Sequence, residues 1–239
     1  MSNKQMKPIK RPRSLCDIAV ENIRNAIIQG SYELGEALSE AMLVNSLGIS
    51  KTPIREALSI LKQEGLVSVI PQKGTFVFTL SAGEVAQLGH YRFALESTAI
   101  DMAMARDAEK LVSDLRKICD RMKKTRDKGQ MDEYLEMDGS FHDAIFTHCG
   151  NEYLTEGYKF VKGKVAALRT HLSHHPTHTD KSYLEHFDIT ELLAEGKIDE
   201  AKLLLQRHVT RGERSYTDTV NDIAEADKKA GLRGKPVSR

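Results

Sequence analysis

Residues 47–58 read Leu-Gly-Ile-Ser-Lys-Thr-Pro-Ile-Arg-Glu-Ala-Leu, and this stretch predicts two helices joined by a tight turn. Gly48 can end the first helix and form the turn, because glycine tolerates backbone angles that other residues avoid. Thr52 can cap the second helix, with Pro53 in its first turn, and apolar residues then keep helical spacing up to Gly65. A turn this short between two helices is typical of a helix-turn-helix unit.

The flanking sequence extends this unit to a winged helix. Residues 15–28 carry apolar side chains at helical spacing and predict a first, packing helix, while residues 39–47 predict the helix before the turn. Two short β-type runs follow at 66–70 and 75–79, joined by Pro-Gln-Lys-Gly at 71–74. Three helices followed by a hairpin are the order expected of a winged helix-turn-helix domain.

The side chains left on the outer face of this unit suit DNA. Arg55 lies near the start of the second helix of the turn, where its guanidinium can donate two hydrogen bonds to one guanine in the major groove. Lys51 and Thr52 suit phosphates, and Lys73 with Gly74 at the wing tip allows a cation and a close backbone approach. The alternative is that these cations are ordinary solvated surface charges. The expected DNA contacts are Ser50, Lys51, Thr52, Arg55, Lys73 and Gly74.

Length and composition place this unit in a larger soluble protein. The chain has 239 residues, of which 40% are hydrophobic and 29% charged, so two domains are expected. The net charge is only +1, but residues 1–80 hold 10 Lys/Arg against 7 Asp/Glu. No apolar run is long enough to cross a membrane, no signal peptide is apparent, and the three cysteines have no paired spacing. We therefore expect a cytoplasmic protein with free thiols.

The first domain resembles the GntR family of transcription regulators. The resemblance rests on residues 47–58, on Glu-Gly-Leu-Val at 64–67 and on Gly-Thr-Phe-Val at 74–77. It implies a DNA-binding regulator that is not an enzyme. Lys51 and Lys73 stand where the family commonly has arginine. Lysine can still contact a phosphate, but it cannot read a base through the paired hydrogen bonds of a guanidinium.

The remainder of the chain predicts an all-helical domain. Ser81 and Glu84 have the spacing of a capping box that begins a new helix, which puts the domain boundary near residues 79–83. Such amphipathic helices bury their apolar stripes best in an antiparallel bundle, where ligand sites form between facing helices. The expected helices are 84–106, 108–128, 131–148, 151–173, 180–195 and 199–225.

Polar residues fall on faces that this bundle would bury. Arg92 and Glu96 are four residues apart on a face with core residues, and they are either a mutual ion pair or a guanidinium waiting for a carboxylate ligand. The spacing does not decide between the two. Asp138 and His142 are also four apart, as helical metal-ligand pairs are.

Two further histidines come to the same level of the bundle. His186 and His208 lie at equal distance from the Glu-Gly-Lys turn at 195–197, so antiparallel helices would bring their imidazoles together. A single histidine at such a position is more often a core or surface residue, and only the convergence of four donors indicates a metal site.

Arg92 with Glu96, Asp138 with His142, Glu185-His186 and His208-Val209 resemble the FCD subclass of GntR regulators. This resemblance implies that Asp138, His142, His186 and His208 bind a divalent metal. It also implies that Arg92 binds the carboxylate of an effector that completes the coordination. Zinc is the first expectation, with nickel or manganese as alternatives. Glu96 and Arg169 are further effector-site candidates, Arg169 through its place in the fourth helix of the bundle.

The sequence thus predicts a mainly α-helical repressor that binds a palindromic operator as a homodimer and responds to a small organic acid. The alternatives are a metal-dependent hydrolase and a DNA-binding protein with a purely structural metal. The expected domains are a basic flexible arm at 1–13, a winged helix-turn-helix at 14–80, a helical metal and effector domain at 84–225, and a flexible tail at 226–239.

Overall fold

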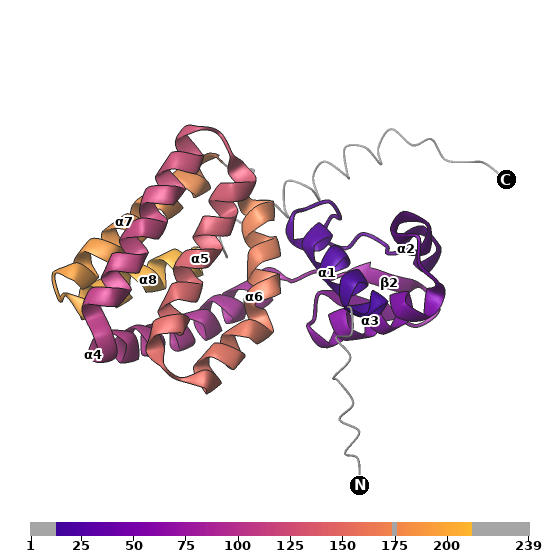
Figure 1. Ribbon diagram of the computed structural model, residues 1–239, viewed down its shortest axis with the longest axis horizontal. Coiled ribbons are helices and arrows are strands. Elements are labelled where there is room, and N and C mark those ends of the chain that lie inside the picture. The colour runs from indigo at the N-terminus through magenta and orange to yellow at the C-terminus, as the bar shows by residue number, and fades with distance from the viewer. Residues whose placement is uncertain (1–12, 174–175, 212–239) are drawn as a thin grey trace, which may run out of the picture. The chain divides into compact units, whose positions relative to one another are not determined.

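The computed structural model describes residues 13–173 and 176–211. Nearly all of the expected basic arm, the end of the helical domain and the whole expected tail lie outside the described residues. The chain divides into two compact units, one ending at Phe78 and the other continuing from Thr79 (Figure 1). Each unit has its own core.

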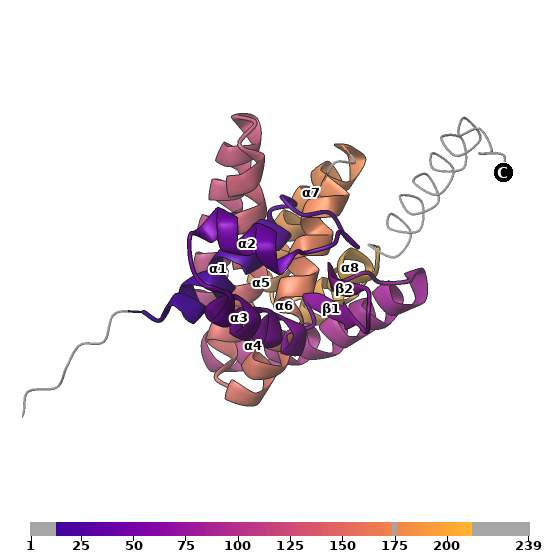
Figure 2. The ribbon, with the colours of Figure 1, turned by 90° about the vertical axis from the view of Figure 1, so that its right-hand side faces the viewer.

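The first unit is a winged helix-turn-helix, as predicted. It consists of α1 (Leu15–Ile28), α2 (Glu40–Leu47) and α3 (Lys51–Gln63), followed by strands β1 (Val67–Ile70) and β2 (Gly74–Val77), all labelled in Figure 2. The strands pair antiparallel, with Val67 opposite Val77 and Ile70 opposite Gly74.

Local chemistry explains the turn between α2 and α3. Gly48 has a positive φ of 66° and its N–H donates to the Val44 carbonyl, so it ends α2 in a conformation that favours glycine. Helix α3 begins at Lys51 with Ser50 in the capping position, two residues earlier than the start at Pro53 that a Thr52 cap predicts. Helices α1, α2 and α3 each bury apolar residues, among them Ile23, Ile27, Leu43, Ile54 and Leu61.

The second unit is an antiparallel helical bundle, as predicted. It contains α4 (Ala82–Asp127), α5 (Met131–Cys149), α6 (Glu152–Ser173), α7 (Pro176–Ala194) and α8 (Ile198–Thr210). The predicted Ser81–Glu84 capping box is present, with Ser81 N–H donating to Glu84 at 2.8 Å and Glu84 N–H donating to Ser81 Oγ at 3.3 Å. Helix α4 packs against α5, α7 and α8.

Helix α4 is divided where the sequence predicted two helices. Asp107 has non-helical angles, φ −164° and ψ 79°, and its side chain accepts a hydrogen bond from the Lys110 N–H at 3.0 Å. A short polar side chain that caps the next turn in this way competes with helix continuation. The two segments therefore change direction at Asp107.

Helix boundaries elsewhere differ slightly from the prediction. Helix α7 starts at Pro176 instead of 180, because proline fits the first turn of a helix, where its missing N–H has no partner to lose. Helix α8 extends through Thr210, and the rest of the predicted helix to 225 lies outside the described residues.

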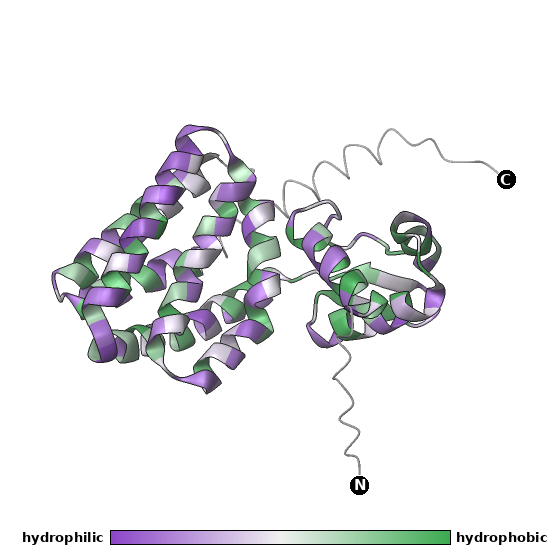
Figure 3. Cartoon of the chain, in the orientation of Figure 1, coloured by the Kyte–Doolittle hydropathy of each residue, from purple (hydrophilic) through white to green (hydrophobic). Residues whose placement is uncertain are grey.

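The bundle core is almost entirely apolar away from one polar centre. Buried residues such as Ile100, Leu111, Leu115, Phe141 and Ile189 form one continuous cluster. Apolar residues form stripes along the bundle helices, beside hydrophilic residues on the same helices (Figure 3). Within the described residues, no helix is long and apolar enough to span a membrane.

We predict that Leu111→Ala destabilises the helical unit by about 2–5 kcal/mol, because Leu111 is fully buried and its loss leaves a cavity. Leu203→Ala is the matched control, since Leu203 is 56% exposed and its loss should change stability by less than about 0.5 kcal/mol. Chemical denaturation followed by circular dichroism measures both. Equal destabilisation by the two variants would contradict the packing described here.

Candidate functional site

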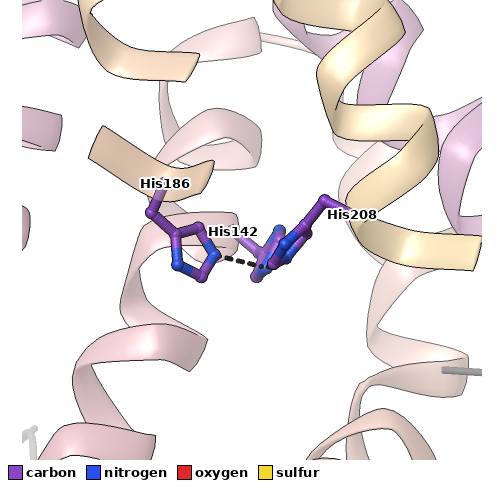
Figure 4. A group of neighbouring side chains, drawn as sticks. All are labelled: His142, His186 and His208. Atoms are coloured by element: carbon purple, nitrogen blue, oxygen red, sulfur yellow. Dashed lines mark hydrogen bonds between the residues drawn. The ribbon is translucent and has the colours of Figure 1, made fainter. Parts of the chain in front are cut away.

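Three histidines from three helices meet in the interior of the bundle. His142 comes from α5, His186 from α7 and His208 from α8, and all three are buried (Figure 4). The Nε2 atom of His142 lies 3.3 Å from that of His186 and 3.4 Å from that of His208. One ring nitrogen from each histidine lies within 4.8 Å of the other two.

A carboxylate and an arginine stand behind His142. Glu96 Oε2 lies 2.7 Å from His142 Nδ1, and Arg92 Nε donates to Glu96 Oε1 at 2.9 Å. Burial would raise the pKa of Glu96, but the positive charge of Arg92 and the contact with His142 hold it at about 2. A carboxylate that accepts from Nδ1 leaves the Nε2 lone pair facing the other histidines.

His208 has the same arrangement. Its Nδ1 lies 2.9 Å from Glu185 Oε2, and the other oxygen of Glu185 forms an ion pair with Arg211 Nη1. Burial lowers the pKa of His208 well below its usual range, and the neighbouring histidines and arginines lower it further. This imidazole is therefore neutral around pH 7, as a metal ligand must be.

His186 also has a carboxylate near its Nδ1 atom, but at a longer distance than the other two rings. Its Nδ1 lies 3.7 Å from Asp138 Oδ2, which accepts a hydrogen bond from Ser182 Oγ at 3.1 Å. The other Asp138 oxygen forms an ion pair with Arg169 Nε. Burial lowers the pKa of His186 to about 3. Burial alone would raise the pKa of Asp138, but the positive charge of Arg169 outweighs it, and the pKa of Asp138 is held at about 2.

The donor set fits a divalent transition-metal ion. Three buried imidazoles are ligands that zinc, nickel and related ions accept. Two ligands of a tetrahedral zinc ion with bonds of about 2.0–2.1 Å are about 3.3–3.4 Å apart, as two of the Nε2 pairs are. His186 Nδ1 is also buried without a hydrogen-bond partner in the described structure, so this ring is incompletely paired.

The structure brings together all seven residues that the sequence nominated for the metal and effector sites. Arg92 and Glu96 form an ion pair, which is one of the two arrangements that their spacing allows. Arg92 Nη2 also lies 3.4 Å from both ring nitrogens of His142. Asp138 lies beside His186 but outside the three-histidine set.

Sequence reasoning gave no role to Ser182, Glu185 or Arg211. Glu185 was noted only as the neighbour of His186, yet its side chain contacts His208 on another helix. Arg211 lies three residues after His208, a spacing that puts two side chains on one helix face and could have identified it.

A small cavity opens beside His208. Its volume is about 60 Å³, and Arg92, Arg169, Arg211 and Ser182 are among the residues that line it. Apolar side chains complete the wall, among them Leu88, Val165, Leu168, Leu172 and Val209. The cavity can hold a small molecule with an anionic group and an aliphatic part.

In the winged-helix unit, all six residues nominated for DNA contact are exposed. Arg55 Nε donates to both carboxylate oxygens of Glu40, at 3.0 and 2.9 Å. Glu40 is the first residue of α2 and Arg55 lies in the second turn of α3, so this ion pair joins the two helices of the turn. The terminal Nη groups of Arg55 are not engaged by this pair.

Comparisons with known proteins agree for both units. Residues 17–77 match the gntR family of bacterial regulatory proteins, and residues 87–211 match the FCD domain. The Nta operon transcriptional regulator of Aminobacter aminovorans is 29% identical over 188 residues, which is 75% of this chain and 84% of that protein. The transcriptional repressor GlaR of Escherichia coli is 32% identical over 143 residues, 56% of this chain and 63% of that protein.

The solved structure of McbR/YncC from E. coli has the same fold, with a TM-score of 0.73 at 18% identity, covering 87% of this chain and all of that one. The family matches cover both units, and the named relatives are regulators of transcription. The chain therefore belongs to the gntR family of bacterial regulatory proteins and is a DNA-binding transcriptional regulator, not an enzyme.

Proposed function

We propose that this regulator is a repressor whose operator affinity is set by a small carboxylate bound beside a divalent metal in the helical unit. The observation that carries the proposal is the meeting of three buried histidines with three arginines that line the adjacent cavity. A purely structural metal would not require guanidinium groups in that wall. Its named relatives are regulators of transcription, which argues against the alternative of a metal-dependent hydrolase.

His142, His186 and His208 would hold the metal, with Asp138 as the fourth protein ligand and zinc favoured over nickel or manganese. The ion would supply a positive charge that anchors a carboxylate oxygen. Glu96 and Glu185 orient the imidazoles of His142 and His208 through Nδ1. A ligand role for Asp138 competes with its ion pair to Arg169.

Arg92 and Arg169 would bind the effector. Arg92 is buried and faces the histidines, and Glu96 fixes its guanidinium through Nε. Arg169 Nη2 is buried without a hydrogen-bond partner in the described structure. A carboxylate satisfies such N–H groups with strong, charge-assisted hydrogen bonds.

In the winged-helix unit, Arg55 would contact a guanine, and Ser50, Lys51 and Thr52 would contact phosphates. Lys73 and Gly74 would approach the backbone at the wing tip. Glu40 holds Arg55 Nε, so both Nη groups remain free to donate to one base. A homodimer would place two such units on a palindromic operator.

His186→Ala should weaken zinc binding at least about tenfold, because it removes one of three converging imidazoles. His148→Ala is the matched control, since His148 pairs with Asp114 away from the cluster at 3.1 Å. Isothermal titration with zinc, after chelator treatment, measures both proteins. Unchanged zinc affinity in the His186 variant would contradict the proposed centre.

Arg55→Ala should weaken binding to an operator recovered by in vitro selection by about 1–3 kcal/mol and relax the preference at one base position. Fluorescence anisotropy against operator and scrambled DNA separates the two effects. Arg116→Ala is the control, because Arg116 is also an exposed arginine paired with a carboxylate, that of Glu191, but lies in the helical unit. Equal loss on both DNAs would assign Arg55 to the phosphates instead.

Glu40→Gln should lower operator affinity less than Arg55→Ala does, because the guanidinium remains but is no longer held. Although this substitution also removes a negative charge near the DNA, which alone would tighten binding, we expect discrimination between operator and scrambled DNA to fall. The ratio of the two dissociation constants is the measurement. An unchanged or higher ratio would show that Glu40 does not position Arg55.

A further inference from the structure

Three arginines from three separate parts of the bundle line the small cavity beside His208. Arg92 belongs to α4, Arg169 to α6, and Arg211 directly follows α8. Among the described residues, Ser182 and His208 are the other polar members of the wall, and none of its members carries a carboxylate. The surface offered to a ligand is therefore cationic on several sides.

Two of these arginines have buried N–H groups that nothing in the described structure accepts. They are Nη2 of Arg169 and Nε of Arg211. A buried donor without an acceptor costs free energy, more so when the group is charged. Because one donor belongs to α6 and the other to the residue after α8, a ligand with a single carboxylate is poorly suited to satisfy both while also reaching Arg92.

The charges behind the cavity are balanced before any ligand binds. Each arginine is paired with one carboxylate: Arg92 with Glu96, Arg169 with Asp138, and Arg211 with Glu185. The histidines between them add no charge when they are neutral. A divalent ion among the histidines would therefore leave two positive charges in a poorly solvated site, which two negative charges on a ligand would offset.

We infer that the effector carries two carboxylates, and that Arg211 takes the second one while Arg92 and Arg169 take the first. This inference rests on the proposed function and narrows its ligand from a small carboxylate to a short dicarboxylate. The cavity volume of about 60 Å³ favours a short chain, and Leu88, Val165 and Leu168 offer an apolar wall to its methylene groups. Arg211 is thus a residue that determines specificity.

The test is isothermal titration of the zinc-loaded, full-length protein with matched acids. Succinate is compared with butyrate, and malonate with propionate, so that each pair differs in one carboxylate. We expect the dicarboxylate to bind at least about tenfold more tightly in each pair. In Arg211→Gln this preference should fall below about threefold, because the second carboxylate loses its partner. Arg116→Gln, on the exposed pair with Glu191, should keep the wild-type preference.

Equal affinity for the two members of each pair would overturn the inference and leave the carboxylate-responsive regulator standing. A preference that survives in a folded Arg211→Gln protein would also overturn the role of Arg211. If inorganic phosphate binds more tightly than either dicarboxylate, the inference is overturned, and the effector carries a single dianionic group instead of two carboxylates. If none of the acids binds, the proposed function itself fails. The wild-type comparison stands even if the Arg211 variant does not fold.

Discussion

In the described part of the helical unit, the buried charges of Arg92, Glu96 and Asp138 are arranged around three buried imidazole rings. Each ring is backed by a carboxylate, and each carboxylate is held by an arginine. Taking such ions out of water costs several kcal/mol apiece, and only close pairing with opposite charge makes that burial tolerable. The pairs with Arg92 and Arg169 also keep Glu96 and Asp138 ionised, so these two carboxylates can accept hydrogen bonds or bind an ion, whereas burial raises the pKa of Glu185.

This arrangement explains why the site needs the whole bundle. Its members come from α4, α5, α6, α7 and the end of α8, so every helix of the unit contributes at least one polar group. The same helices bury the surrounding apolar cluster, which excludes water and strengthens each electrostatic contact. A ligand that binds arginines from several helices can favour one packing of the helices over another. In a two-state regulator, such a shift in packing couples ligand binding to DNA binding.

Local signals were sufficient to predict much of this protein. Gly48 and Pro53 fixed the helix-turn-helix, Ser81 and Glu84 marked the start of the bundle, and the equal spacing of His186 and His208 about one turn predicted their meeting. Contacts that depend on side-chain direction between helices were not readable. Glu185 reaches His208 instead of its neighbour His186, and the spacing of Arg92 and Glu96 could not reveal that Glu96 also holds His142.

Operator affinity measured with and without metal and acid tests the account most directly. Fluorescence anisotropy with a selected operator would be carried out on metal-free protein, with zinc, with succinate, and with both. The account predicts that succinate changes the dissociation constant at least about fivefold when zinc is bound, and little in its absence. An operator affinity that is the same under all four conditions, or a response to succinate that does not depend on zinc, would contradict it.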